Sequence, residues 1–204
     1  MNALLLLPAG LLAGAAFLLP AASDAAVAAA TPASAAAPVT WKIDPSHTTV
    51  GFRIKHMEAS WFHGRFNEVS GTVIHDAEHP SGSSIAFEIA TASVDTNHKD
   101  RDDHLRNADF FNAKVHPKIS FRSTEVAAAG KDKLKVKGML SLHGVEKELE
   151  FTADVTGAGK APWGELIGFE AGFTVKRSEY GITAYPGALG EEVRVNVAIE
   201  AIKQ

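Results

Sequence analysis

Hydrophobic and polar residues alternate one by one along most of the chain after residue 41. In the sequence VGFRIK at 50–55, for example, every second residue is apolar. The same alternation recurs in seven further segments, at 66–74, 85–89, 119–126, 134–142, 149–155, 169–175 and 193–199. A period of two is typical of antiparallel strands with one buried and one solvated face. The pattern therefore predicts an all-β domain of eight strands.

Eight such strands form either a sandwich or a closed barrel. Closure removes the edge strands that invite aggregation, and a barrel of this size holds either its own side chains or one small ligand. The chain has no cysteine, so no disulfide stabilises the domain. We favour the closed, eight-stranded antiparallel barrel. Within the segment 66–74, Phe66 and Val69 have opposite parity although both are apolar, which predicts a β-bulge.

One segment interrupts the alternation between the third and fourth predicted strands. Residues 96–113 read TNHKDRDDHLRNADFFNA and combine many charges with Leu105, Phe110 and Phe111. Thr96 or Asn97 is a suitable N-cap, and aspartates in the first turns favour a helix. We therefore expect a short helical insertion here.

The alternation also places polar residues on the apolar face at strand ends. Continuing the first strand by one inward position leads to His56, and continuing the seventh leads to Arg177. Odd-numbered strands of an up-and-down barrel run the same way, so both residues should lie at one rim, together with the helical insertion and its His104. The loop carrying Tyr180 begins at the same rim. This predicts a rim of His56, His104, Arg177 and Tyr180 that meets a polar headgroup.

The inward rows would then line the site of an apolar tail, since ligand pockets are mostly apolar with a few convergent polar groups. The predicted lining comprises Val50, Phe52, Ile54, Phe87, Phe121, Leu140, Phe151, Phe169, Phe173, Val175 and Val197. Two alternatives stay open. The interior is filled by its own side chains, or His56 and Arg177 are structural residues that need no ligand.

Residues 1–40 differ sharply from the rest of the chain. They carry a single charged side chain, Asp24, and an apolar run rich in leucine and alanine. This is the pattern of a secretory signal peptide with small-residue cleavage steps, although no Lys or Arg precedes the run. We expect a cleaved signal at 1–30, an Ala/Pro-rich disordered linker at 31–40 and one domain at 41–204. The expected location is the periplasm.

Other chemistries have weaker support in the sequence. A formal net charge of −4 offers no basic field for nucleic acid. His98, Asp100, Asp102 and His104 have metal-ligand residue types but no recognised ligand spacing, so a metal-assisted hydrolase that uses this cluster is only an alternative function. A stress-response interaction module with a filled barrel is the other alternative. Asp44, Ser46 and His47 have the residue types of a hydrolase triad, but they lie too close in sequence for its geometry.

Several motifs resemble the YceI-like family. They include DPSH at 44–47, RDDHL at 101–105, DFF at 109–111 with His116-Pro117, GMLSLHGV at 138–145 and RSEYGI at 177–182. The resemblance covers essentially all of 41–203 in the same order, with His143 where the family often has Arg. It implies a lipocalin-like antiparallel barrel that is secreted to the periplasm and binds a polyprenyl phosphate or an isoprenoid quinone.

The combined interpretation is a non-catalytic carrier that holds a long-chain polyisoprenoid lipid in its barrel. It requires no metal and no cofactor besides that lipid. It allows for transient contact with a membrane surface and for a homodimer, with no nucleic-acid partner.

Overall fold

The computed structural model describes residues 37–204. The expected signal peptide at 1–30 and most of the expected linker lie outside this range. Within it, the chain forms the strands β1 Val39–Ile43, β2 Thr49–His56, β3 Ser60–Phe66, β4 Val69–His75, β5 Ser84–Ala90, β6 Val94–Asp95, β7 Lys118–Gly130, β8 Lys133–Leu142, β9 Val145–Ala161, β10 Gly164–Lys176 and β11 Leu189–Lys203. The helix α1 spans Lys99–Leu105, and short 3-10 helices occupy Pro45–His47, Pro80–Gly82, Thr91–Ser93 and Arg177–Tyr180.

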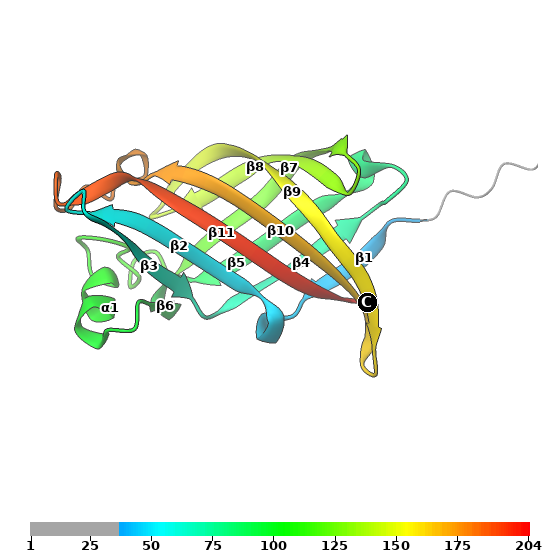
Figure 1. The fold of residues 1–204 in the computed structure, drawn as a ribbon, viewed down its shortest axis with the longest axis horizontal. Helices are drawn as coiled ribbons and strands as arrows, with labels where there is room; N and C mark the ends of the chain where they lie inside the picture. Colours follow the sequence, from blue (N-terminus) through cyan, green and yellow to red (C-terminus); the bar gives the residue numbers. More distant parts are fainter. Residues whose placement is uncertain (1–36) are drawn as a thin grey trace, which may run out of the picture. The chain divides into compact units, whose positions relative to one another are not determined.

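These strands close into an antiparallel barrel with eight positions, as the alternation predicted (Figure 1). Three of the positions are each filled by two consecutive strands. The shared positions are those of β1 with β2, β3 with β4, and β5 with β6. In one series β11 pairs with β1, β1 with β4 and β4 with β5. In the other, β11 pairs with β2, β2 with β3 and β3 with β6. From β7 to β11 every strand pairs with the next along the chain. The β1–β11 pairing closes the ring.

The parity change predicted within 66–74 occurs at Asn67 and Glu68, which separate β3 from β4. Phe66 and Val69 are therefore both buried although an odd number of steps separates them. A register shift in β7 between Ser123 and Glu125 has the same effect, and it turns Val126 inward. Each irregularity lets a strand change face without leaving the sheet.

The two ends of the barrel differ. The helix end is formed by the β2–β3 turn, the insertion, the β8–β9 turn and the loop before β11, at 57–59, 96–117, 143–144 and 177–188. Figure 1 shows α1 at this end, beside β6. The opposite turn end has the connections 76–83, 131–132 and 162–163. The sequence-based expectation that the insertion and the loop share one end is thus met.

The N-cap of α1 differs from the expected Thr96 or Asn97. His98 occupies that position, and its Nδ1 accepts a hydrogen bond from the Arg101 backbone N–H at 3.4 Å. Asn97 has φ +60° and instead donates its N–H to Asp95. Thr96 is buried and donates both its N–H and its hydroxyl to the Asp102 carboxylate. The local Asx turn at Asp95 therefore delays the helix start by one residue.

Candidate functional site

A cavity of about 530 Å³ occupies the barrel interior at the helix end. Its volume lies within the ~300–1,000 Å³ usual for small-molecule sites. Its walls are mostly aliphatic and aromatic side chains from β2, β3, β5, β7, β8, β10 and β11, completed by Leu105, Phe110 and Phe111 of the insertion. The exposed residues His56, Met57 and Tyr185 also border it, so the cavity opens to solvent at this end, here called the mouth.

Eight of the eleven predicted lining residues border this cavity. They are Val50, Phe52, Ile54, Phe87, Leu140, Phe173, Val175 and Val197. Alternate residues of a strand point to opposite faces, and this alone places these eight side chains inside the barrel.

The other three predicted lining residues lie deeper, toward the turn end. Phe121 is only 2% exposed and packs between Phe87 and Phe151, with ring centroids 5.5 and 5.3 Å away. Phe151 and Phe169 border a separate pocket of about 30 Å³. Alternation identified their inward face correctly, but it carries no information about depth along the barrel.

Four aromatic rings form a floor between the cavity and the small pocket. Phe87, Phe121, Phe151 and Phe173 follow one another with centroid separations of 5.3–5.5 Å. Phe87 and Phe173 border both spaces, whereas Phe121 borders neither. The floor therefore limits how far a tail entering from the mouth can extend in this conformation.

At the mouth, the insertion meets the loop before β11 through aromatic side chains. The His104 ring lies edge-on to Phe110 and Tyr185, at 5.1 and 5.9 Å, and Phe110 stacks on Tyr185 at 6.0 Å. His104 Nε2 also lies 3.1 Å from Asp109 Oδ2. His56 and His104 both border the cavity, as predicted for the rim.

Arg177 borders the cavity too, but backbone carbonyls already engage most of its donors. Its Nε donates to the Gly190 carbonyl at 2.9 Å, and its Nη atoms donate to the carbonyls of Ile182, Ala184 and Leu189. The side chain is 6% exposed. Four of its five N–H groups therefore hold the loop in place, which leaves little capacity for a headgroup.

Tyr180 is not among the residues that border the cavity, contrary to the prediction. It ends the 3-10 helix that follows β10 and is 3% exposed, and burial raises the pKa of its phenol. Its carbonyl oxygen lies 2.9 Å from His143 Nδ1. Tyr185 borders the mouth instead. The alternation of inward and outward side chains applies only to strands and not to a 3-10 helix. The sequence therefore could not show which of the two tyrosines borders the cavity.

Arg101 is a mouth residue that the strand argument could not find, because it lies in the helical insertion. Its guanidinium carbon lies 4.2 Å from the centroid of the Phe62 ring, and both residues border the cavity. Nε and one Nη donate to the hydroxyl and carbonyl oxygens of Thr96 at 2.8 and 2.9 Å. Three N–H groups remain for other partners.

The histidine and aspartate run of α1 does not converge on a point. His98 caps the helix, Asp102 is buried and bonded to Thr96, and His104 turns toward Tyr185. In the part of the chain that the structure describes, the group of metal-ligand types with converging atoms is Asp44, His47 and Glu200.

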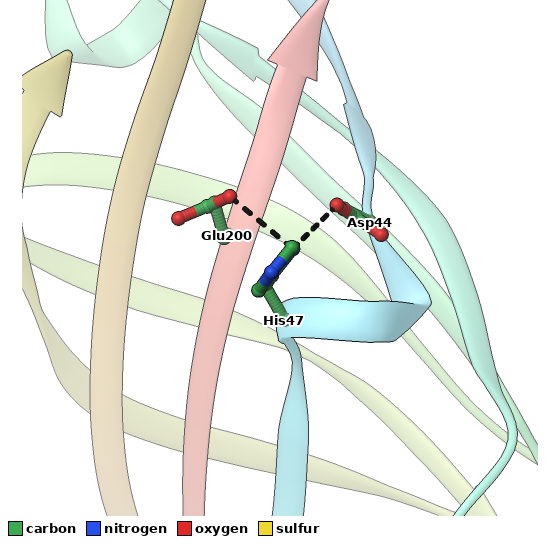
Figure 2. A group of neighbouring side chains, drawn as sticks. All are labelled: Asp44, His47 and Glu200. Carbon is green, nitrogen blue, oxygen red and sulfur yellow. Dashed lines mark hydrogen bonds and ion pairs between the residues drawn. The ribbon is translucent and has the colours of Figure 1, made fainter. Parts of the chain in front are cut away.

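That group lies where β1 bends into β2, and Figure 2 shows His47 between the two carboxylates. His47 Nδ1 lies 2.8 Å from Asp44 Oδ2 and 3.6 Å from Glu200 Oε1. The hydrogen bond to Asp44 raises the pKa of His47 and lowers that of Asp44. The cluster is an ion pair that joins the bend to β11, and it does not border the cavity.

No helix among residues 37–204 has the length and apolar character needed to cross a membrane.

Comparison with known proteins places these features in a family. The YceI-like domain matches residues 41–201. A UPF0312 protein of Pseudomonas aeruginosa is 41% identical over 172 residues, covering 83% of this chain and 90% of that protein. Protein YceI of Salmonella newport is 40% identical over 173 residues with the same coverage of both chains.

Solved structures show the same fold. The Campylobacter jejuni YCEI protein has a TM-score of 0.65 at 32% identity, over 79% of this chain and 96% of that one. Burkholderia cenocepacia BcnA has a TM-score of 0.71 at 23% identity, over 78% and 99%. A polyisoprenoid binding domain from Saccharophagus degradans has a TM-score of 0.64 at 15% identity, over 81% and 99%.

Proposed function

Since this chain belongs to the YceI-like family, we propose that it binds a long-chain isoprenoid lipid, with the tail in the 530 Å³ cavity and the headgroup at the mouth. The observation that carries the proposal is the apolar lining of that cavity together with its opening among His56, Arg101 and His104. The fold is shared with a protein described as a polyisoprenoid binding domain, which supports this choice of ligand class.

The energetics are adequate for holding an isoprenoid tail out of water. Burying one five-carbon isoprene unit contributes at most roughly 3–4 kcal/mol, at ~0.8 kcal/mol per carbon. Micromolar affinity requires about 8 kcal/mol after the cost of association. A few units thus suffice, so the tail supplies the affinity and the mouth residues supply selectivity.

The headgroup is proposed to bind to hydrogen-bond donors at the mouth. Arg101 has N–H groups left to donate, and His56 and His104 border the same opening. A guanidinium forms charge-assisted hydrogen bonds with phosphate, and either imidazole can donate to a quinone carbonyl. Both a polyprenyl phosphate and an isoprenoid quinone fit this donor set. We propose a carrier role that uses no catalytic step of the protein's own.

The decisive test is extraction of protein purified from its native host with organic solvent, followed by mass spectrometry. We expect a prenyl lipid in stoichiometric amount. A clean extract, combined with failure to take up added polyprenyl phosphate or quinone, would contradict the proposal. The variant Leu140→Arg puts a charge on the cavity wall and should purify without lipid, whereas Met139→Arg, the neighbouring position of opposite parity on β8, should retain it.

We further propose that the N-terminal segment is a cleaved export signal and that the carrier acts in the periplasm. The support is the composition of residues 1–30. Cell fractionation together with N-terminal sequencing of the purified protein tests this. Recovery in the cytoplasmic fraction with residue 1 or 2 at the N-terminus would contradict it.

A further inference from the structure

Three cations from two strands surround one tryptophan on the outer wall of the barrel. The guanidinium carbons of Arg53 and Arg194 lie 4.8 and 4.7 Å from the centroid of a Trp61 ring, and the Lys55 ammonium lies at 5.2 Å. These four residues are called the cationic patch. Arg53 is in register with Arg194 on β11, and Lys55 is in register with Trp61 on β3. The patch is thus continuous across three neighbouring strands.

The patch faces away from the cavity. Its members on β2 alternate with the cavity-lining residues Phe52 and Ile54, and Arg194 alternates with the cavity-lining Val193 and Val195. Side chains one step apart on a strand point to opposite faces. The three charges therefore lie outside the barrel and play no part in lining the tail site.

Most other surface lysines of the barrel are paired with acids. On β8 and β9, Lys133 pairs with Asp154, Lys135 with Glu150 at 2.9 Å and Lys137 with Glu148 at 3.3 Å. That lysine row is therefore neutralised.

The cationic patch is not neutralised in this way. Within residues 37–204, no carboxylate oxygen lies within 4.0 Å of the side-chain nitrogens of Arg53, Lys55 or Arg194. Arg53 Nε is buried and has no hydrogen-bond partner in the same part of the chain. Arg65, farther along β3, pairs with Asp95 at 3.2 Å and does not add to the excess charge. The ring face attracts each cation, but the like charges repel one another, and a nearby anion would relieve that repulsion.

The patch runs along the wall to the mouth. Lys55 directly precedes His56, and the β2–β3 turn that follows carries Met57, which borders the cavity and is 61% exposed. Tyr185, 52% exposed, borders the same opening. A surface that covers the patch and extends past the turn would therefore reach the cavity entrance.

We propose that the cationic patch docks the barrel on an anionic phospholipid surface and sets the mouth against that surface. This inference deepens the proposed function, because it rests on a lipid ligand that must enter from a bilayer. Tryptophan favours the headgroup region, and Arg and Lys are attracted to anionic lipid. The whole chain has a net charge of −4, so the attraction must be local. At physiological salt the electrostatic screening length is about 8 Å, so the patch attracts anionic lipid over a short range in which more distant acidic residues have little effect.

Vesicle sedimentation tests the docking. The protein is mixed with vesicles of phosphatidylcholine alone, or of phosphatidylcholine with phosphatidylglycerol, at several salt concentrations. We expect binding only to the anionic vesicles, weakening as salt rises. At ~1 kcal/mol per cation, each lost charge weakens binding about fivefold, so R53Q/K55Q/R194Q should bind on the order of 100-fold more weakly. W61A should also bind more weakly.

The matched control is K133Q/K135Q/K137Q, which removes the same net charge from the paired lysine row and carries the same N-terminal segment. It should bind anionic vesicles like the wild type. Equal losses in the two triple variants would overturn the proposal, because binding would then follow net charge alone. No binding of the wild type to anionic vesicles would also overturn it. Glu58→Gln, in the turn beside Met57, should strengthen binding about fivefold at most.

The test also separates docking from lipid binding. Capture of detergent-solubilised polyprenyl phosphate needs no bilayer, so R53Q/K55Q/R194Q should capture it like the wild type. Normal capture with lost vesicle binding supports the docking role. Normal vesicle binding by the wild type without capture would contradict the proposed function and leave the docking surface supported. Loss of capture in the triple variant would overturn the assignment of the patch to docking alone.

Discussion

The two halves of the barrel interior share one alternating pattern but have different contents. Toward the turn end the inward side chains meet one another, and the remaining pocket is only about 30 Å³. Toward the helix end the same pattern leaves a cavity of about 530 Å³. The difference shows that a strand pattern can specify which side chains point into a barrel without specifying how much of the interior they fill.

The physical cause lies in where the rings go. In the filled half, the rings form a continuous series, in which Phe121 packs against Phe87 and Phe151, and Phe151 packs against Phe173. In the hollow half, Phe52 packs sideways against Phe66 and Phe111, at 5.6 and 6.4 Å. Gly64 permits this, because a Cβ at that position would overlap the Phe52 ring. The ring therefore covers the wall and does not cross the cavity.

The largest effect is expected in the filled half. Phe121→Ala removes a ring that is 2% exposed and should lower the free energy of unfolding by about 3–5 kcal/mol. Ile54→Ala, on the cavity wall, should cost only about 2 kcal/mol, the lower end of the usual range, because its side chain is already partly exposed to the cavity. Urea unfolding monitored by fluorescence measures both. Equal losses would show that the two halves are equally packed.

The loop at the mouth should depend on Arg177. Arg177→Lys cannot satisfy four carbonyls in a fixed planar arrangement, so we expect a loss of about 2–3 kcal/mol and faster proteolysis within residues 182–190. The exposed Arg122→Lys is the control and should change neither property. If the loop of Arg177→Lys resists proteolysis as well as that of the wild type, Arg177 does not hold the loop in place.

Two substitutions of Phe173, in the aromatic floor, should change the space available to a lipid tail in opposite directions. Phe173→Trp should fill the lower cavity and weaken capture of a prenyl lipid about tenfold, which is ~1.4 kcal/mol. Phe173→Ala should join the two spaces that Phe173 borders and shift capture toward longer chains. Competition between prenyl lipids of different length measures both. The control Thr174→Trp adds the same ring on the exposed face. Unchanged selectivity in both Phe173 variants would remove Phe173 from the site.

The smallest effect is expected at the bend between β1 and β2. The raised pKa of His47 stabilises the fold below its unfolded pKa, and this contribution is lost as pH rises through the folded value. The lowered pKa of Asp44 stabilises above its unfolded value, and this contribution is lost as pH falls through the folded one. The pair thus contributes most between about pH 4 and pH 6.5. His47→Gln should lower the thermal midpoint slightly there, and this effect should shrink as pH rises through the folded pKa of His47.

Much of the site's frame could be predicted from the sequence. The position of His56 at the mouth follows from counting inward steps along β2, and eight lining residues follow in the same way. Arg101 and Tyr185 could not be found so, because they lie in an insertion and a loop whose paths depend on contacts with Phe62 and His104. The cationic patch could not be predicted from the sequence either, because strand register decides which surface charges pair with one another.

The sequence by itself determined that the barrel has eight strand positions, which face of each predicted segment points inward and the end at which the insertion lies, because the period of two and the chain order specify them. It did not indicate β1 or β6, and the predicted segments reach β3 only at Phe66. Only the tertiary structure decided that one half of the interior is hollow and that three cations share Trp61. Both depend on distances across the sheet and across the barrel, and these are set by closure and register, which no local pattern encodes.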